Sequence, residues 1–249
     1  MSTRKPDADL SPVSVDSIAE DLFGLNIRGV KSILVLWRKP ADYFDAARRP
    51  DWDNRFTPSI RLWLSFFALY SALNFWWFGS NQAMIGAFAS GYANSGMVLP
   101  PDVTYEQVGR EAMLWGFGVI PVLQISTMLV LSLIYTAWGE RTTLAVRQRF
   151  LFAVIVPSAS LMPVFLTIML WVPQHMLTAY GLFLALVTWL IDFMTGYRGG
   201  FAHVSKTGRA WRAGLLAFIV VLLNTGTSIA AQIAGIVLIG QKYAIPPAG

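Results

Sequence analysis

The stretch FLFAVIVPSASLMPVFLTIMLWV, residues 150–172, contains no charged side chain and is long enough to cross a lipid bilayer as a helix. The hydrocarbon layer of a membrane is about 30 Å thick, and an α-helix needs roughly 20 apolar residues to cross it. Four other stretches have the same character, which predicts an all-α fold, a polytopic membrane bundle of five transmembrane helices. The predicted spans cover residues 58–78, 113–138, 150–172, 175–195 and 213–240.

The composition of the whole chain agrees with a membrane protein. Of its 249 residues, 55% are hydrophobic and 13% are charged, and the mean hydropathy is +0.52. Soluble proteins carry about 25% charged residues, so this chain has too few charges to cover a surface that faces water. Cysteine is absent, which excludes disulfides, thiolate metal sites and a thiol nucleophile.

The basic residues predict the orientation of the bundle, because short cytoplasmic loops retain Lys and Arg. All but two of the 19 Lys and Arg residues lie near or before the start of the first span, or in the loops after the second and fourth spans. The two exceptions are Arg110 and Lys242. We therefore expect a cytoplasmic N-terminus and an external C-terminus. Arg is far more frequent than Lys, which is typical of GC-rich bacterial genomes, so we expect a bacterial inner membrane.

The parts outside the spans are short. Residues 1–14 are polar and contain proline, which predicts a disordered cytoplasmic tail. Residues 15–57 carry apolar side chains at roughly helical spacing, and we expect one or two amphipathic helices in the cytoplasmic interface. Segment 79–112 either lies on the outer surface or dips back into the bundle. Residues 241–249 form an external tail.

Net positive charge is concentrated in the two cytoplasmic loops between spans. Arginine side chains in such loops bind lipid phosphates through paired N–H donors, and topology alone also explains these charges, so both explanations stay open. The candidate contacts to anionic head groups are Arg147, Arg149, Arg198, Arg209 and Arg212.

The fifth span changes character halfway, where a purely apolar run is followed by NTGTSIAAQIAG, residues 224–235. Small residues spaced four apart allow two helix backbones to approach closely. They predict helix–helix packing, either within the bundle or between subunits. The two rows are Gly226 with Ala230, and Thr227 with Ala231 and Gly235.

Polar side chains inside the spans form a second candidate site. Asp192 lies near the cytoplasmic end of the fourth span, and an ionisable residue within a span is a functional candidate by default. The alternative is a salt bridge to Arg61, Arg198 or a loop arginine. The candidate residues of a polar pocket are Gln124, Asn224, Gln232 and Asp192.

The sequence contains no recognisable catalytic constellation. The only two histidines, His175 and His203, fall on opposite membrane faces in this topology. They therefore cannot share a metal site, and they cannot both serve as bases for the same serine nucleophile. Chemistry that depends on Mg²⁺ needs several carboxylates, whereas Asp192 stands alone. We expect no enzyme activity, no catalytic residue, no metal, no cofactor and no nucleic-acid partner.

Several features resemble the Yip-type, Rab-interacting family of membrane proteins and its bacterial relatives. They are five spans with an external C-terminus, prolines in the third span, and a lead-in with Pro40, Tyr43 and Phe44 in a P-x-x-Y-F pattern. The stretch DLFG at residues 21–24 is similar to a D-L-aromatic-G stretch of eukaryotic members, with Leu25 where these carry proline. The resemblance covers residues 20–240 and implies membrane organisation or assistance to transport.

Two functions follow from these observations. The first is a non-enzymatic accessory, scaffold or assembly subunit of a larger membrane complex, whose partners are membrane lipids and other membrane-protein subunits or copies of itself. The second is a small-molecule or lipid transporter or channel that uses the polar pocket between spans two, three and five.

Overall fold

The computed structural model describes residues 27–49, 51–52, 55–78, 81–134, 143–201 and 204–243. These residues form helices joined by short connections, and no strand occurs among them. The predicted all-α class is therefore confirmed. The predicted tail at residues 1–14, the DLFG stretch and His203 lie outside the described residues.

Four helices are long and apolar enough to cross a membrane, which gives the chain the architecture of a multi-pass membrane protein. They correspond to the second to fifth predicted spans. A 3₁₀ turn at Gln174–Met176 and a π-helical turn at Gly196–Gly200 extend the third of them at its two ends. The four are α6 (Tyr105–Ile134), α7 (Leu144–Met169), α8 (Leu177–Thr195) and α9 (Lys206–Lys242).

The first predicted span is helical but is not one of these four. Helix α4 covers Ser59–Leu73, and a π-helical turn at Asn74–Phe78 continues it. The pitch changes at Asn74, whose side-chain amide donates a hydrogen bond to the Tyr70 carbonyl oxygen at 2.9 Å. The segment has 15 residues in regular α-helix and 20 with the π-helical turn, but Arg61 and Asn74 make it less apolar than the other four. A five-span topology therefore stays a prediction.

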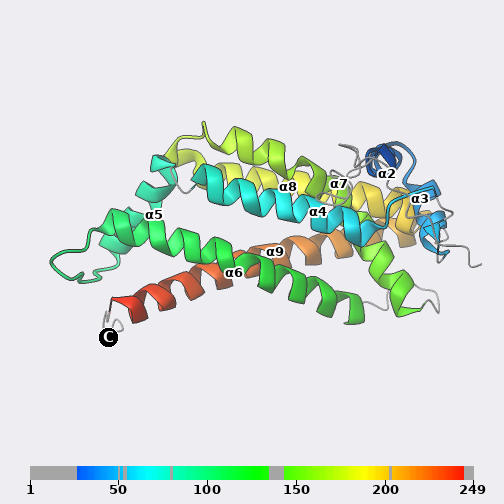
Figure 1. The fold of residues 1–249 in the computed structure, drawn as a ribbon. Coiled ribbons are helices and arrows are strands. Elements are labelled where there is room, and N and C mark those ends of the chain that lie inside the picture. Colours follow the sequence, from blue (N-terminus) through cyan, green and yellow to red (C-terminus); the bar gives the residue numbers. More distant parts are fainter. Residues whose placement is uncertain are drawn as a thin grey trace, which may run out of the picture.

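The long helices pack as a closed group. Helices α4, α7 and α8 run side by side in one layer, and α6 and α9 cross beneath it (Figure 1). The contact between α6 and α9 is the most extensive, and the contact between α4 and α6 is small. Every long helix thus contributes one face to the interior of the bundle.

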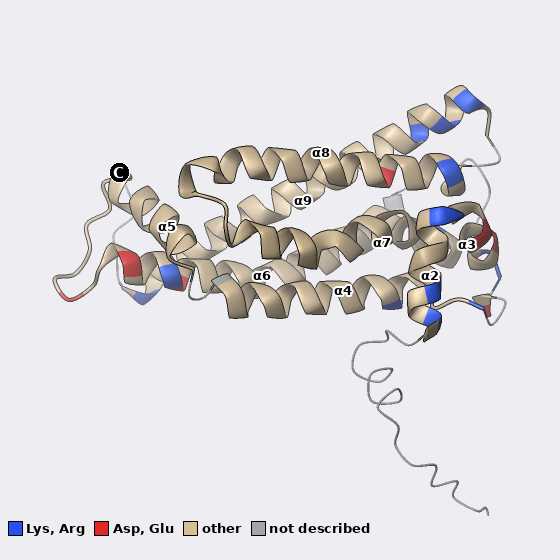
Figure 2. Cartoon of the chain, turned by 90° about the horizontal axis from the view of Figure 1, so that it is seen from above, with Lys and Arg blue, Asp and Glu red and all other residues tan. Residues whose placement is uncertain are grey.

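Lysine and arginine gather at one end of the bundle, which we call the basic end (Figure 2). Helices α2 (Ile27–Arg38) and α3 (Pro40–Ala47) lie there, against α7 and the π-helical turn after α8. The opposite end carries α5 (Gln82–Asn94), which packs along α6. Segment 79–112 therefore contributes a packed helix and is not a simple surface loop.

Helix α3 is anchored to the bundle by two aromatic residues. Tyr43 and Phe44 are fully buried, and the Phe44 ring lies 5.3 Å from the ring of Phe150 on α7. A Cβ atom on Gly199 would lie 2.5 Å from the Phe44 ring, so the π-helical turn after α8 needs glycine at this position. The basic end therefore has one hydrophobic core that N-terminal helices and spanning helices share.

A chain of hydrogen bonds reinforces this core. The Tyr43 hydroxyl donates to the Thr57 carbonyl oxygen at 2.7 Å, and the Thr57 N–H donates to Ser32 Oγ at 2.8 Å. Burial raises the pKa of the Tyr43 phenol, so the hydroxyl keeps its proton and its role as donor. The two N-terminal helices and the entry to α4 are joined by these bonds.

We expect Tyr43→Phe to lower the free energy of unfolding by about 1–2 kcal/mol, because the buried Thr57 carbonyl loses its donor. Thermal unfolding of the purified protein in detergent measures the loss. Tyr197→Phe is the control, since it removes a partly exposed hydroxyl at the same end of the bundle. Equal stability of the two variants would contradict the assigned role of the Tyr43 hydroxyl.

Helices α6 and α9 approach closely along one of the two predicted small-residue rows. Thr227, Ala231 and Gly235 are buried, and a Cβ atom on Gly235 would lie 2.7 Å from the Ala112 carbonyl oxygen of α6. Near the same contact, a Cβ atom on Gly116 would lie 3.6 Å from the Ala231 carbonyl oxygen. This row packs inside the chain, so it is not available for contacts between subunits.

The other row, Gly226 and Ala230, is exposed on α9, and no atom lies within 4 Å of a Cβ atom built on Gly226. At the end of the bundle that carries α5, an ion pair also joins α6 to α9: Lys242 Nζ lies 2.7 Å from Glu111 Oε2.

The two glycines of α9 give a matched pair of variants. Gly235→Ala is expected to lower stability by about 1–3 kcal/mol, because the added methyl group forces the α6 and α9 backbones apart. Gly226→Ala meets open space and is expected to be neutral or to stabilise by up to about 1 kcal/mol through helix propensity. Thermal denaturation in detergent compares them, and similar melting temperatures for both variants would refute the internal role of Gly235.

Candidate functional site

A cavity of about 280 Å³, lined by both polar and apolar side chains, lies between the long helices, and α4, α6, α7, α8 and α9 all contribute to its wall. Part of its wall belongs to the shared core of the basic end, including Trp63, Phe67 and Met128. The cavity therefore brings polar side chains of several helices together beside an apolar core.

Three of the four predicted pocket residues, Gln124, Asn224 and Asp192, line this cavity. Gln124 Nε2 donates a hydrogen bond to Asn224 Oδ1 at 3.0 Å and so links α6 to α9. Ser158 of α7 and Thr188 of α8 also line the cavity, and the sequence analysis missed both. The place of Thr188 in the lining could have been predicted from the sequence, because Thr188 precedes Asp192 by one helical turn and so shares its face. Ser158 gave no such indication, since a single serine in an apolar helix commonly bonds its own backbone.

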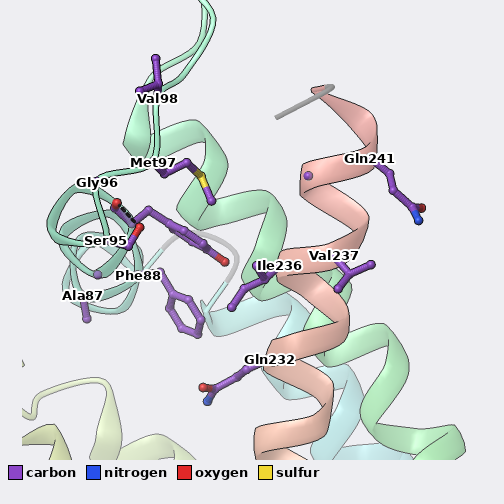
Figure 3. A pocket seen from close by; sticks show the side chains of 13 residues that line it. Ala87, Phe88, Ser95, Gly96, Met97, Val98, Gln232, Ile236, Val237 and Gln241 are labelled. Carbon is purple, nitrogen blue, oxygen red and sulfur yellow. Dashed lines mark hydrogen bonds between the residues drawn. The ribbon is translucent and has the colours of Figure 1, made fainter. Parts of the chain in front are cut away.

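Gln232 does not belong to this cavity, which corrects the predicted pocket. It is exposed and lines a separate hollow of about 1010 Å³ between α5 and the end of α9. Figure 3 shows Gln232, Ile236 and Val237 along α9, across from Phe88. The eight-residue separation from Asn224 leaves the two side chains about 80° apart around the helix axis, because an α-helix has 3.6 residues per turn.

Asp192 is the only acidic or basic side chain among the residues that line the cavity. It is 2% exposed, and the Ser158 hydroxyl lies within hydrogen-bonding reach of its carboxyl group. The other carboxyl oxygen, Oδ1, has no hydrogen-bond partner among the described residues. The salt bridge to Arg198 considered as an alternative does not form, because the Arg198 guanidinium is engaged elsewhere. A buried carboxyl group thus faces the cavity without a countercharge from the described part of the chain.

Two of the arginines predicted to contact lipid head groups bind the ends of the N-terminal helices. Arg198 Nη2 donates to the Arg38 carbonyl oxygen at 2.8 Å, at the end of α2. Arg149 Nη1 donates to the carbonyl oxygens of Ala47 at 3.2 Å and Arg49 at 2.7 Å, at the end of α3. The last carbonyl groups of a helix lack partners in the helix, and a cation there also interacts favourably with the helix dipole. Both arginines therefore hold the N-terminal helices to the bundle.

The remaining three candidates differ among themselves. Arg209 Nε donates to the Val204 carbonyl oxygen at 2.8 Å, in the connection that precedes α9. Arg147 and Arg212 are partly exposed at the basic end. Contacts of all five arginines with lipid head groups stay a prediction.

Comparison of the chain with models of protein families, with curated proteins and with solved structures finds no match. The resemblance to the Yip-type family stays a prediction, and the argument for function rests on the geometry of the cavity.

Arg149→Gln is expected to lower the free energy of unfolding by about 1–3 kcal/mol, because it removes charge-assisted hydrogen bonds from the α3 carbonyl groups. Thermal unfolding in detergent without anionic lipid measures this effect free of any contribution from head groups. Arg212→Gln removes the same charge from the same end of the bundle and is expected to change stability by less than about 0.5 kcal/mol. An equal loss in both variants would show that net charge at the basic end, and not the helix-end contact, determines stability.

Proposed function

We propose that this protein binds a small solute in the cavity between α6, α7, α8 and α9 and carries it across the membrane. This is the second of the two functions derived from the sequence. The observation that supports it is Asp192, a buried carboxyl group that faces the cavity while one of its oxygens has no partner among the described residues.

Polar side chains are costly in a membrane interior, so they occur there either to join helices or to line a pathway. The hydrogen bond between Gln124 and Asn224 is sufficient to explain both of these residues as a link between helices. One carboxyl oxygen of Asp192, Oδ1, has no hydrogen-bond partner among the described residues, and an unpartnered buried oxygen contributes nothing to the packing of a bundle. Binding of a solute is the explanation that uses it.

Prolines next to the cavity provide a means of movement. Pro157 lies inside α7 beside Ser158, and Pro121 lies inside α6 one turn before Gln124. Each proline removes a backbone hydrogen bond of the helix and permits bending at that point. Bending of α6 and α7 at these positions would open the cavity toward one end at a time, as transport requires.

We extend the proposal to the topology of the chain. Helix α4 and its π-helical turn would form the first of five spans, because α4 packs along α7 and lines the same cavity at the same depth. The gathering of Lys and Arg supports a cytoplasmic basic end, an external C-terminus and a bacterial inner membrane.

A second candidate is the role of accessory, scaffold or assembly subunit. The exposed row of Gly226 and Ala230 on α9 supports it, since small residues on an outer helix face permit close contact with another membrane helix. The partner would be another membrane-protein subunit or a second copy of this chain.

Filling the cavity tests the transport proposal. Gly181 lines the cavity, and no atom lies within 4 Å of a Cβ atom built there, so Gly181→Leu adds bulk at the cavity wall from a position where the first added carbon meets open space. Gly118→Leu is the matched control, because Gly118 is equally open and lies outside the cavity lining. Mass spectrometry after gentle extraction from the native membrane is expected to find one enriched small molecule with the wild type and Gly118→Leu, and not with Gly181→Leu.

The opposite result is equally informative. The same small-molecule content in all three proteins would overturn the transport proposal. A stoichiometric protein partner that co-purifies with all three would favour the accessory-subunit role.

A further inference from the structure

We propose that the cavity takes a small protonated amine, with the carboxylate of Asp192 as its counter-ion. This inference rests on the proposed function, because it names the class of solute that the same cavity binds. Three independent features of the wall support it: its single charge, the polarity of its hydroxyl groups and its aromatic side.

The charge of the wall has one sign. Asp192 is the only ionisable acidic residue among the described residues that line the cavity, and none of them is a lysine or arginine. An ionised carboxylate in a medium of low dielectric is unstable unless a cation or several hydrogen bonds compensate it. An anionic solute such as a lipid phosphate would meet repulsion there, whereas a cation supplies the missing countercharge.

Two hydroxyl groups of the wall act as acceptors. The hydroxyl hydrogens of Thr188 and Ser228 are donated to backbone carbonyl oxygens of their own helices, at 2.9 Å to Leu184 and Asn224. A hydroxyl group has one hydrogen to donate, so each oxygen presents only lone pairs to the cavity. Together with the carboxylate, these oxygens favour a solute that donates hydrogen bonds, as an ammonium group with N–H bonds does.

The side of the cavity that α4 forms is aromatic. Trp63 and Phe67 stack with ring centroids 5.1 Å apart, and Phe67 and Tyr70 stack at 6.3 Å, so the rings form a continuous series along α4. The faces of aromatic rings attract cations, and the attraction is largest where water is excluded. An ammonium ion that reaches an open ring face of this series gains this attraction in addition to that of the carboxylate.

The volume restricts the size of the amine. A cavity of about 280 Å³ lies just below the range of roughly 300–1,000 Å³ that is usual for drug-sized ligands. A short alkylamine fits this space, and a lipid with two acyl chains does not. The cavity therefore favours a small solute over the lipid that the sequence analysis left open.

The test compares two probes of similar size that differ in charge, n-butylammonium and n-butanol. Equilibrium dialysis of labelled probe against the full chain in nanodiscs of zwitterionic lipid measures binding, with empty nanodiscs as the blank. We expect the wild type to bind n-butylammonium at least about tenfold more tightly than n-butanol. The uncharged alcohol forms neither the ion pair with Asp192 nor the cation–π contacts.

Two variants locate the effect. Asp192→Asn keeps the shape and polarity of the side chain and removes its charge, so it is expected to abolish the preference for n-butylammonium. Glu106→Gln removes one negative charge from an exposed position outside the cavity and is expected to leave the preference unchanged. The charge dependence of the wild type alone still tests the inference if Asp192→Asn fails to fold.

Equal affinity of the wild type for both probes, a preference that persists in Asp192→Asn, or no binding of either probe would each overturn the inference. Gly181→Leu separates this failure from that of the proposed function. If n-butanol binds as tightly as n-butylammonium and Gly181→Leu abolishes both, the cavity still binds solutes and only the amine is wrong. If Gly181→Leu changes neither, the solute site and the amine fall together.

Discussion

A polar group within a lipid bilayer is stable only when another polar group satisfies it, and the structure of this protein follows from that constraint. Backbone amides satisfy one another in helices, and serine and threonine hydroxyls donate to the carbonyl groups of their own helices. The Gln124 and Asn224 amides pair with each other across the boundary between α6 and α9. Asp192, one of whose carboxyl oxygens has no partner among the described residues, is an exception beside the cavity, and the proposed function depends on it.

The same constraint connects the N-terminal helices to the bundle. The last carbonyl groups of α2 and α3 have no partners within their helices, and Arg198 and Arg149 reach across from the spanning helices to supply donors. Tyr43 and Phe44 add an apolar contact beneath these bonds.

The helices were predictable from the sequence because the length and hydropathy of each segment depend only on local residues. The predicted span 175–195 nearly coincides with α8. The starts of α6 and α7 were set too late, because both helices extend beyond their apolar stretches into polar segments. The candidate site was predicted in part: Asp192, Asn224 and Gln124 line one cavity, whereas Ser158 and Thr188 gave little or no signal and Gln232 faces a different hollow.

Composition and hydropathy by themselves determined that this chain is helical and belongs in a membrane, since both follow from the free energy of transferring each segment out of water. Only the tertiary structure decided what the polar and basic residues do. Whether a small-residue row joins helices of one chain or of two depends on which face meets α6, and the contact of Gly235 with Ala112 shows the former for one row. Likewise, the charge of Arg149 suits a lipid head group and a helix end equally well, so the sequence does not distinguish these two contacts. The fold shows that Arg149 binds the end of α3.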